Sequence, residues 1–368
     1  MSNIYRAKGI KIADQYEDVG RLFKKQINQS FEIDSIKMKM VDKVLDSVRS
    51  NPDLLTFYEC FAGWARGAGI DEQHAMYLLA DNTSGCQTAI VRYGSGVALL
   101  HTEEDYYDVS ARMNTQHTIE FRDGARTLKC LTYNDLMPGA GLYGWQKDMI
   151  IAVDSLFLRE DGIFEIERPM LANIIAWLIW YETPRDADAN TIVAKLQKLG
   201  TMVDGYAINV VRRCKRSIEG YKVTFARDEW EVEQLGDKVG DNLRQVNIVE
   251  PEYARKNSPV SRYRHAPWKM GIDYYGFLTR LRNMKSHISE HRELLTQQLV
   301  QANIEPVHKV IHKTIFEKYK KYYVTEWMGA MCVGLVDNAG LSVSTKLNDK
   351  QPSELVEYVD LILGDALL

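Results

Sequence analysis

The chain has 368 residues, of which 45% are apolar and 26% charged, and its formal net charge is −4. These values are typical of a globular protein with a sizeable core, and the negative charge argues against a nucleic-acid partner, which would require a basic surface. No apolar run is long enough to span a membrane, so we expect no membrane partner. The five cysteines form no CxxC pair and the N-terminus has no signal-like apolar segment, which favours reduced thiols in a cytoplasmic protein.

The first 80 residues have helical patterns. Apolar residues recur at helical spacing between residues 12 and 50, and again over 54–68. Gly69 is suited to end the second region, and Asp71 to cap a short helix over 72–80. We therefore expect a helical segment that delivers the chain to a strand beginning near residue 85.

Residues 85–105 (GCQTAIVRYGSGVALLHTEED) read as a β-hairpin around the glycines of the sequence GSG. If Tyr93 pairs with Val97, then Ser95 is the centre of the turn and Cys86 lies opposite Glu104. Cross-strand neighbours have Cβ atoms about 4.5–5.5 Å apart, so a thiol and a carboxylate could share one site. The plain alternative is a core hairpin whose cysteine is a small apolar filler.

The rest of the chain predicts mixed structure. Strands are expected over 118–121, 126–133, 149–158, 207–211, 221–226, 230–233, 242–249 and 322–336, and helices over 169–181, 187–199 and 274–302. The glycine-rich stretch 138–144 lacks a phosphate-loop ending and predicts a tight turn rather than a nucleotide site. We find no repeat or linker, which makes residues 1–368 a single domain of the α+β class.

Two histidine pairs have the i,i+4 spacing that places two imidazoles on one helical face: His287 with His291, and His308 with His312. A metal site needs a third ligand, which this spacing does not supply. We expect polar surface positions here, and neither a metal nor a cofactor.

An ordered set of motifs resembles the autoprocessing acyltransferase and amidase family that includes acyl-CoA:6-aminopenicillanic acid acyltransferase and the β-alanyl-amine hydrolases. This family is a branch of the N-terminal nucleophile (Ntn) hydrolases. The matching segments are residues 62–69 (AGWARGAG), 85–88 (GCQT), 100–105 (LHTEED), 137–144 (MPGAGLYG), 245–247 (QVN) and 261–262 (SR).

The resemblance implies a four-layer αββα sandwich and a precursor that cuts itself between Gly85 and Cys86. Residues 1–85 would then form a helical pro-segment and residues 86–368 the catalytic chain. Cys86 would attack the Gly85 carbonyl, with Thr88 part of the processing motif, and water would release a new N-terminal cysteine. Its α-amino group, with an ordinary pKa of about 7.7–8.0, could then serve as the base for its own thiol.

The resemblance also assigns the remaining roles. A hairpin carboxylate, Glu104 or Asp105, would hold the α-amine, and Asn247 would donate to the oxyanion. Arg262 or Arg264 would position a substrate carboxylate, and we place Asp154 and Trp145 near the substrate as well. The expected partners are a small-molecule amide or acyl donor and an amine acceptor.

Several positions depart from the family pattern. Gln87 stands where Thr or Ser is usual, Asp154 where relatives tend to have Asn, and Glu104 where they have Asp. These departures favour one alternative, an unprocessed relative that acts as a binding or accessory protein. A separate alternative is an unrelated enzyme in which His101 or His74 assists the thiol of Cys86. The sequence identifies neither the substrate nor the oligomeric state.

Overall fold

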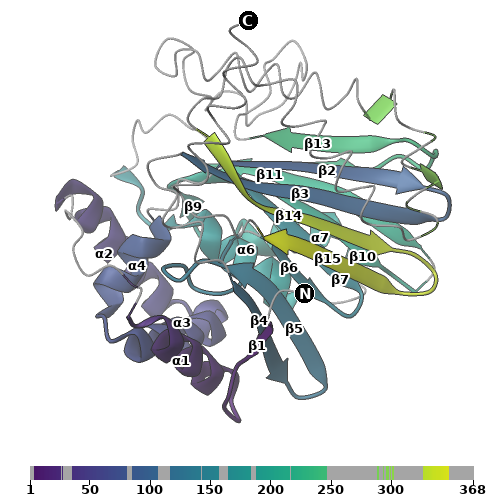
Figure 1. Ribbon diagram of the computed structural model, residues 1–368. Coiled ribbons are helices and arrows are strands. Elements are labelled where there is room, and N and C mark those ends of the chain that lie inside the picture. The colour runs from purple at the N-terminus through teal and green to yellow at the C-terminus, as the bar shows by residue number, and fades with distance from the viewer. Residues whose placement is uncertain are drawn as a thin grey trace, which may run out of the picture.

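The computed structural model describes residues 4–25, 27, 35–80, 85–106, 117–141, 143–156, 165–183, 188–215, 217–246 and 326–347, with isolated positions between 288 and 301 (Figure 1). Among these residues the chain combines helices with a large, mostly antiparallel sheet and a smaller second sheet. This is an α+β architecture, as the sequence predicts.

The helices fall mainly in the first 80 residues. They are α1 (Ile12–Phe23), α2 (Ser35–Ser50), the short 3-10 helix η1 (Pro52–Leu54), α3 (Leu55–Ala68), α4 (Glu72–Ala80), α6 (Ala172–Glu182) and α7 (Ala189–Leu196). The region predicted as helical over 12–50 thus consists of two helices. Gly69 ends α3 in the left-handed conformation, with φ of 73°, and Asp71 accepts the backbone N–H of His74 at 2.8 Å at the start of α4. Both predicted boundaries are confirmed.

Within the described residues, the larger sheet has eight strands in the order β1-β4-β5-β6-β7-β10-β11-β12. Their bounds are β1 (Ile4–Arg6), β4 (His117–Asp123), β5 (Arg126–Thr132), β6 (Tyr143–Gln146), β7 (Met149–Ser155), β10 (Gly205–Arg213), β11 (Ile218–Ala226) and β12 (Glu229–Gln234). Two short strands, β8 (Pro169–Met170) and β9 (Thr201–Met202), pair separately.

The smaller sheet has five strands in the part of the chain that the structure describes, in the order β13-β2-β3-β14-β15. Their bounds are β2 (Gly85–Tyr93), β3 (Gly96–Tyr106), β13 (Asn242–Val246), β14 (Glu326–Val336) and β15 (Leu341–Leu347). The expected hairpin of residues 85–105 is therefore present, and it lies in the middle of this sheet.

The register of that hairpin differs from the prediction by one residue. Tyr93 pairs with Gly96, not Val97, because a two-residue turn closes the hairpin. Gly94 takes a positive φ of 45° at the first turn position, which is the glycine position of a type II′ turn. As a result Cys86 lies opposite Glu103, and Glu104 lies opposite Gly85. The predicted pairing of Cys86 with Glu104 is wrong.

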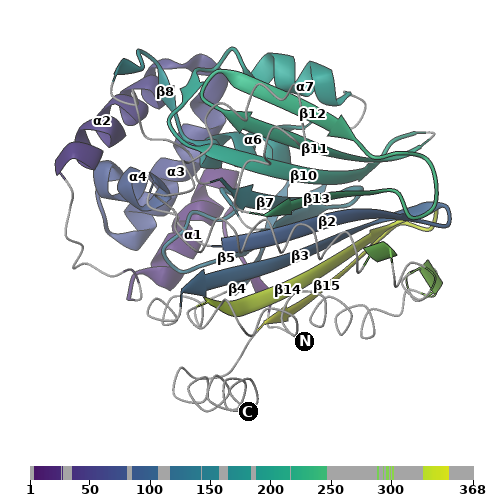
Figure 2. The same cartoon turned by 90° about the horizontal axis from the view of Figure 1, so that it is seen from above.

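The two sheets pack face to face, and helices cover the other face of the larger one (Figures 1 and 2). The larger sheet separates two hydrophobic cores, and alternate residues of β7 belong to different ones. Ile151 and Val153 pack with the helices, whereas Ile150 and Ala152 pack with the smaller sheet. The described residues therefore form three successive layers: helices, the larger sheet and the smaller sheet.

The glycines of the segment 62–69 allow α3 to pack closely on α1. A Cβ atom at Gly63 would lie 2.5 Å from the carbonyl oxygen of Ala13, and one at Gly67 would lie 2.0 Å from that of Glu17. Both distances are too short for real carbon atoms, so only glycine fits there. This part of the family-like motif is explained by helix packing in the structure.

Candidate active site

Cys86 is the second residue of β2 and is 2% exposed. On the paired strands, Ile90 and Leu99 belong to the core between the two sheets. Because side chains alternate along a strand, position 86 belongs to this inner face together with positions 88 and 90. Position 103, directly opposite Cys86, lies on the same face of the sheet, whereas position 104 belongs to the other face.

A buried polar network begins two residues beyond Cys86 and crosses between the sheets. Thr88 donates a hydrogen bond of 2.7 Å from Oγ1 to Oδ2 of Asp154 on β7. Asn209 on β10 donates a second bond of 2.7 Å from Nδ2 to the same oxygen. The Nδ1 atom of His101 on β3 lies 2.8 Å from the Thr88 hydroxyl oxygen. We call Thr88, His101, Asp154 and Asn209 the inter-sheet network; none is more than 1% exposed.

The hydrogen bonds of the network define the tautomer of His101. Thr88 has one hydroxyl proton, which it donates to the Asp154 carboxylate. Its oxygen can then accept only a proton that His101 carries on Nδ1. With Nδ1 protonated, the Nε2 atom of the neutral imidazole is the basic nitrogen. The network thus orients His101 in the way that a carboxylate orients a catalytic histidine, with a threonine hydroxyl interposed.

Two further residues support the His101 ring. Tyr143 on β6 stacks against it, with ring centroids 5.9 Å apart and an angle of 23° between the planes. Burial raises the pKa of Tyr143 well above its ordinary value, so the phenol stays neutral. Cys332 of β14 is the cross-strand neighbour of His101 and is fully buried. His101 is therefore held between β2, β6 and β14.

A buried positive charge lies beside the network. Lys222 on β11 pairs in register with Asn209, and its side chain is 1% exposed. Its Nζ lies 2.7 Å from Oε1 of Glu233 and donates to the carbonyl oxygen of Arg244 on β13 at 3.1 Å. Since a buried cation requires such partners, Lys222 is an ordered part of the inter-sheet region, and it also ties the larger sheet to the edge strand of the smaller one.

The other thiols differ from Cys86 in their surroundings. Cys60 and Cys130 pack in the core between the helices and the larger sheet, and burial raises the pKa of each thiol far above its usual range. They are unsuited to nucleophilic chemistry because the thiolate is the reactive form. Cys214 directly follows β10 and is only partly buried. Among the described cysteines, Cys86 and Cys332 are the two that adjoin the inter-sheet network.

The strand pairing is irregular next to Cys86. The register of β14 against β3 shifts between Met328, which pairs with Glu104, and Ala330, which pairs with Glu103. Such β-bulges are frequent next to active sites, where they redirect side chains. The bulge thus lies one strand away from Cys86, opposite the acidic end of the hairpin.

The structure brings some of the predicted site residues together and separates another. Gly85, Cys86 and Thr88 share β2, and Thr88 binds Asp154 directly. Trp145 instead lies on β6, opposite Ile150 of β7. Ile150 is four residues before Asp154 along the same strand, which is about 13 Å at 3.3 Å per residue. Other predicted residues lie outside the described part of the chain: Asn247, Arg262, Arg264, His287, His291, His308 and His312.

His74, the other histidine considered as a partner of the thiol, is not brought to Cys86. It lies in α4, where its Nδ1 is 2.6 Å from Oδ2 of Asp71, and its side chain is 42% exposed. Cys86, by contrast, is buried between the sheets. Within the described residues, His101 is thus the histidine that the fold places near this thiol.

Asn209 and Lys222 are site residues that the sequence motifs do not predict. Both are polar residues inside apolar strand segments, AINVV and YKVTFA. An amide or ammonium group in such a segment is a signal of a buried polar site, provided that a second layer covers that face of the sheet.

Comparison with models of known protein families gives no match, and neither does comparison with curated proteins. In the described part of the chain, no cluster of three or more His, Cys, Asp or Glu side chains could hold a metal ion. None of the helices described there has both the length and the apolarity needed to span a membrane.

Proposed function

We propose that the protein is a self-processing, N-terminal-cysteine amidohydrolase or acyltransferase of the Ntn type, acting on a small linear amide or acyl donor. The observation that carries this proposal is the position of Cys86, at the start of a central strand and beside the inter-sheet network. A nucleophile at the start of a strand, between two packed sheets, is what the family resemblance leads one to expect.

In the processing step, Sγ of Cys86 attacks the carbonyl carbon of Gly85. The peptide C–N bond breaks, the departing nitrogen takes up the thiol proton, and a thioester joins Gly85 to Sγ. Water then hydrolyses the thioester, which leaves a carboxylate on Gly85 and a free thiol and α-amine on Cys86. The products would be residues 1–85 and the catalytic chain 86–368.

In turnover, the α-amine of Cys86 accepts the thiol proton as the thiolate attacks the substrate carbonyl, and it returns this proton to the leaving amine. Water or an amine acceptor then releases the acyl group. Glu103 is the acidic residue opposite Cys86, which makes it a better candidate than Glu104 for holding the α-amine; Asp105 shares the face of position 103. Asn247 as oxyanion donor and Arg262 or Arg264 as substrate-binding residues remain part of the proposal.

The inter-sheet network has a positioning role in this mechanism. Its bonds join β2 to β7 and β10, so they set the distance between the Cys86 strand and the larger sheet. A shift of this strand by about 1 Å would be enough to reduce the rate strongly, because nucleophilic attack requires near-contact geometry.

The burial of the smaller sheet supports the fourth layer of an αββα sandwich. Gln87, Val91, Leu100 and Val333 alternate with the inner-face residues, and each is at most 6% exposed. A sheet that is buried on both faces requires a covering layer on each side. We therefore propose the four-layer arrangement. Since all five cysteines are free, we also propose the reducing cytoplasm as its location.

The test is the intact mass of freshly purified protein under denaturing conditions. We expect the fragments 1–85 and 86–368 in the wild type and in Cys214→Ala, and one full-length species in Cys86→Ala. Full-length protein in all three would overturn the self-processing mechanism. Cleavage at another position would exclude Cys86 as the processing nucleophile.

A second candidate function is favoured by the corrected hairpin register, in which His101 shares the inner face with Cys86. The two are diagonal neighbours, for which Cα atoms lie about 7–8 Å apart. An enzyme in which Nε2 of His101 activates an uncut Cys86 thiol would keep its full-length mass. Its amidase activity would be lost in His101→Gln, whereas the Ntn mechanism has no proton transfer through this ring. A non-processing binding protein would show neither cleavage nor amidase activity.

A further inference from the structure

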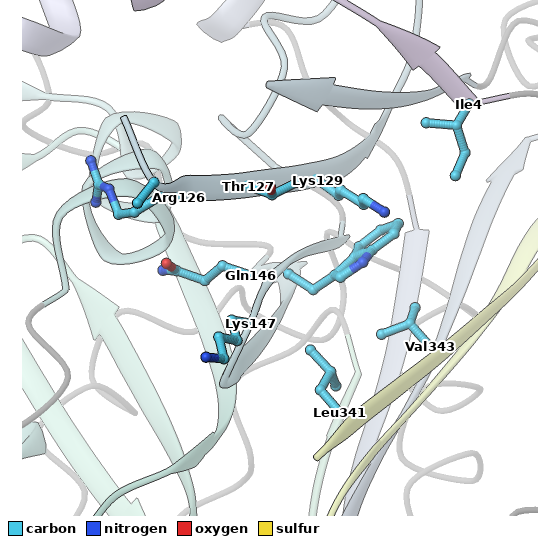
Figure 3. A pocket seen from close by; sticks show the side chains of 10 residues that line it. Ile4, Arg126, Thr127, Lys129, Gln146, Lys147, Leu341 and Val343 are labelled. Carbon is cyan, nitrogen blue, oxygen red and sulfur yellow. The ribbon is translucent and has the colours of Figure 1, made fainter. Parts of the chain in front are cut away.

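A pocket of about 670 Å³ is lined by residues of both sheets (Figure 3). Its walls come from β5 and β6 of the larger sheet, from Ile4 of β1 and from the edge strand β15. Leu341 of β15 lies in the same cross-strand row as Arg92 of β2. Arg92 is six residues beyond Cys86 along β2, so the two are about 20 Å apart at 3.3 Å per residue. The pocket is therefore separate from the candidate active site.

One part of the lining is apolar. Trp145 contributes an indole whose position is supported by Tyr143, with ring centroids 5.8 Å apart. Ile4 is 42% exposed, and Leu341 and Val343 form the side made by the smaller sheet (Figure 3). A flat aromatic surface facing aliphatic side chains suits a flat apolar molecule, and the volume is within the usual range of small-molecule sites, about 300–1,000 Å³.

The charged part of the lining is positive. Lys129 lies directly opposite Trp145 in the β5–β6 pairing, so its ammonium group and the indole border the same space. Lys147 follows in the turn after β6, and Arg126 completes the cationic set. None of the described residues that line the pocket is Asp or Glu.

The neighbouring acidic residues do not neutralise this charge. Glu120 forms ion pairs with Lys129 at 3.3 Å, Arg6 at 3.4 Å and Arg122 at 3.6 Å, so one carboxylate is shared among three cations. Lys147 has no carboxylate partner within the described residues. Arg126 is occupied by Asp123 and by the Tyr181 carbonyl oxygen, which it binds at 2.8 Å. Lys129 and Lys147 are thus the cations best placed to bind an anion.

We propose that this pocket binds a small aromatic carboxylate, with its ring against Trp145 and its carboxylate at Lys129, whose ammonium group lies beside the indole (Figure 3). Lys147, on the other side of the indole, adds to the positive charge of the pocket. An anion there would relieve the excess positive charge around Glu120. The aromatic part would cover the indole and the aliphatic side chains of β15, removing apolar surface from water. The proposal does not depend on cleavage at Cys86 or on any catalytic activity.

The test is calorimetric titration of the full protein with 1-naphthoate, beside the uncharged 1-naphthamide. We expect naphthoate to bind at one site and the amide to bind roughly tenfold more weakly or not at all, because only the anion gains charge-assisted bonds. The double variant Lys129→Gln/Lys147→Gln should weaken naphthoate binding by roughly tenfold or more. Lys198→Gln, an exposed lysine at the end of α7, is the matched control and should bind as the wild type does.

A second measurement locates the ligand. Naphthoate should change the tryptophan fluorescence of the wild type and of Cys86→Ala, and this change should be lost in Trp145→Leu. Binding that is absent, equal for acid and amide, unchanged in the double lysine variant or unchanged in Trp145→Leu would overturn the proposal. Loss of binding in Cys86→Ala would also overturn it, because the ligand would then occupy the candidate active site.

Discussion

Thr88 and Asp154 come from different sheets, and the hydroxyl of one donates a 2.7 Å hydrogen bond to the carboxylate of the other. The bond is fully buried, and it joins a residue of the Cys86 strand to the centre of the larger sheet. Both residues are candidates from sequence, but as parts of different features: Thr88 belongs to the processing motif and Asp154 is a departure from the family pattern. In the structure they form one unit with His101 and Asn209.

Thr88→Val should weaken this unit. Valine has the shape of threonine but no hydroxyl, so Asp154 loses one donor and His101 loses its acceptor. Removing one partner from a buried hydrogen-bonded group costs about 1–3 kcal/mol, and we expect the free energy of unfolding to fall by that amount. Urea denaturation measures it. Thr88→Ser keeps the hydroxyl and should retain most of the stability; equal losses in the two variants would mean that packing, not hydrogen bonding, is the cause.

The hairpin register predicts which acidic residue holds the α-amine of Cys86. The α-amine of Cys86 exists only after cleavage, so the carboxylate that holds it acts in turnover. Because Glu103 lies opposite Cys86, Glu103→Gln should still form both fragments but should lower amide turnover by roughly tenfold or more, through loss of the negative charge that holds the α-amine. Glu104→Gln changes a position on the other face of the sheet and should keep normal turnover. The rate of amide turnover by the processed proteins compares them. A defect in Glu104→Gln with normal turnover in Glu103→Gln would contradict the assignment.

The sequence predicts the two strands of the hairpin that contains Cys86, but not the register in which they pair. Three residues of the sequence GSG suggest a three-residue turn, whereas Gly94 and Ser95 alone form it. Gly96 belongs to β3 and lies beneath the Tyr93 ring, where a Cβ would come 2.6 Å from Cζ. Since side chains alternate along strands, this one-residue difference moves His101 to the face of Cys86. Turn length, a local detail, thus determines which residues share the site.

Sequence patterns do not predict the contacts between the two sheets. Lys222 and Thr224 alternate with apolar residues in β11, a pattern that does not tell whether the polar face meets water or a second layer. In the structure the second sheet covers this face, and Lys222 is buried against Glu233 and Arg244. A strand pattern shows which residues share a face, but the packing of another layer decides whether that face meets water. Asn209 is hidden from sequence analysis for the same reason.

The close packing of α1 and α3 makes Gly67 a sensitive position. In an exposed helix, replacing Gly by Ala stabilises by about 1 kcal/mol. At Gly67 the new methyl group would meet the carbonyl oxygen of Glu17 at 2.0 Å, so α1 and α3 would have to separate. We expect Gly67→Ala to lower the free energy of unfolding by about 1–3 kcal/mol, as overpacking does. Thermal denaturation tests this, and a gain in stability would contradict the tight crossing.

Asp204 provides a prediction about pH. It accepts the backbone N–H of Ala172, the first residue of α6, at 2.7 Å. Burial raises the pKa of Asp204 from 3.8 to about 6, although hydrogen bonding and the charges of Arg227 and Lys37 act in the opposite direction. A raised pKa means that the folded state binds the proton more tightly than the unfolded state. The contribution of this group to stability is therefore fully present below about pH 4 and is lost as the pH rises through 6.

Asp204→Asn should remove this dependence, because the amide keeps an acceptor for Ala172 but carries no charge. We expect the variant to be more stable than the wild type at pH 7.5, on the order of 1–2 kcal/mol after allowing for partial solvent exposure, and nearly equal to it at pH 4. Urea denaturation at the two pH values measures the difference. Asp188 is the matched control, because hydrogen bonds from Thr191 lower the pKa of this helix-capping carboxyl. Asp188→Asn should therefore lose stability at pH 7.5, so a gain in both variants would indicate a general effect of reduced negative charge instead of the burial of Asp204.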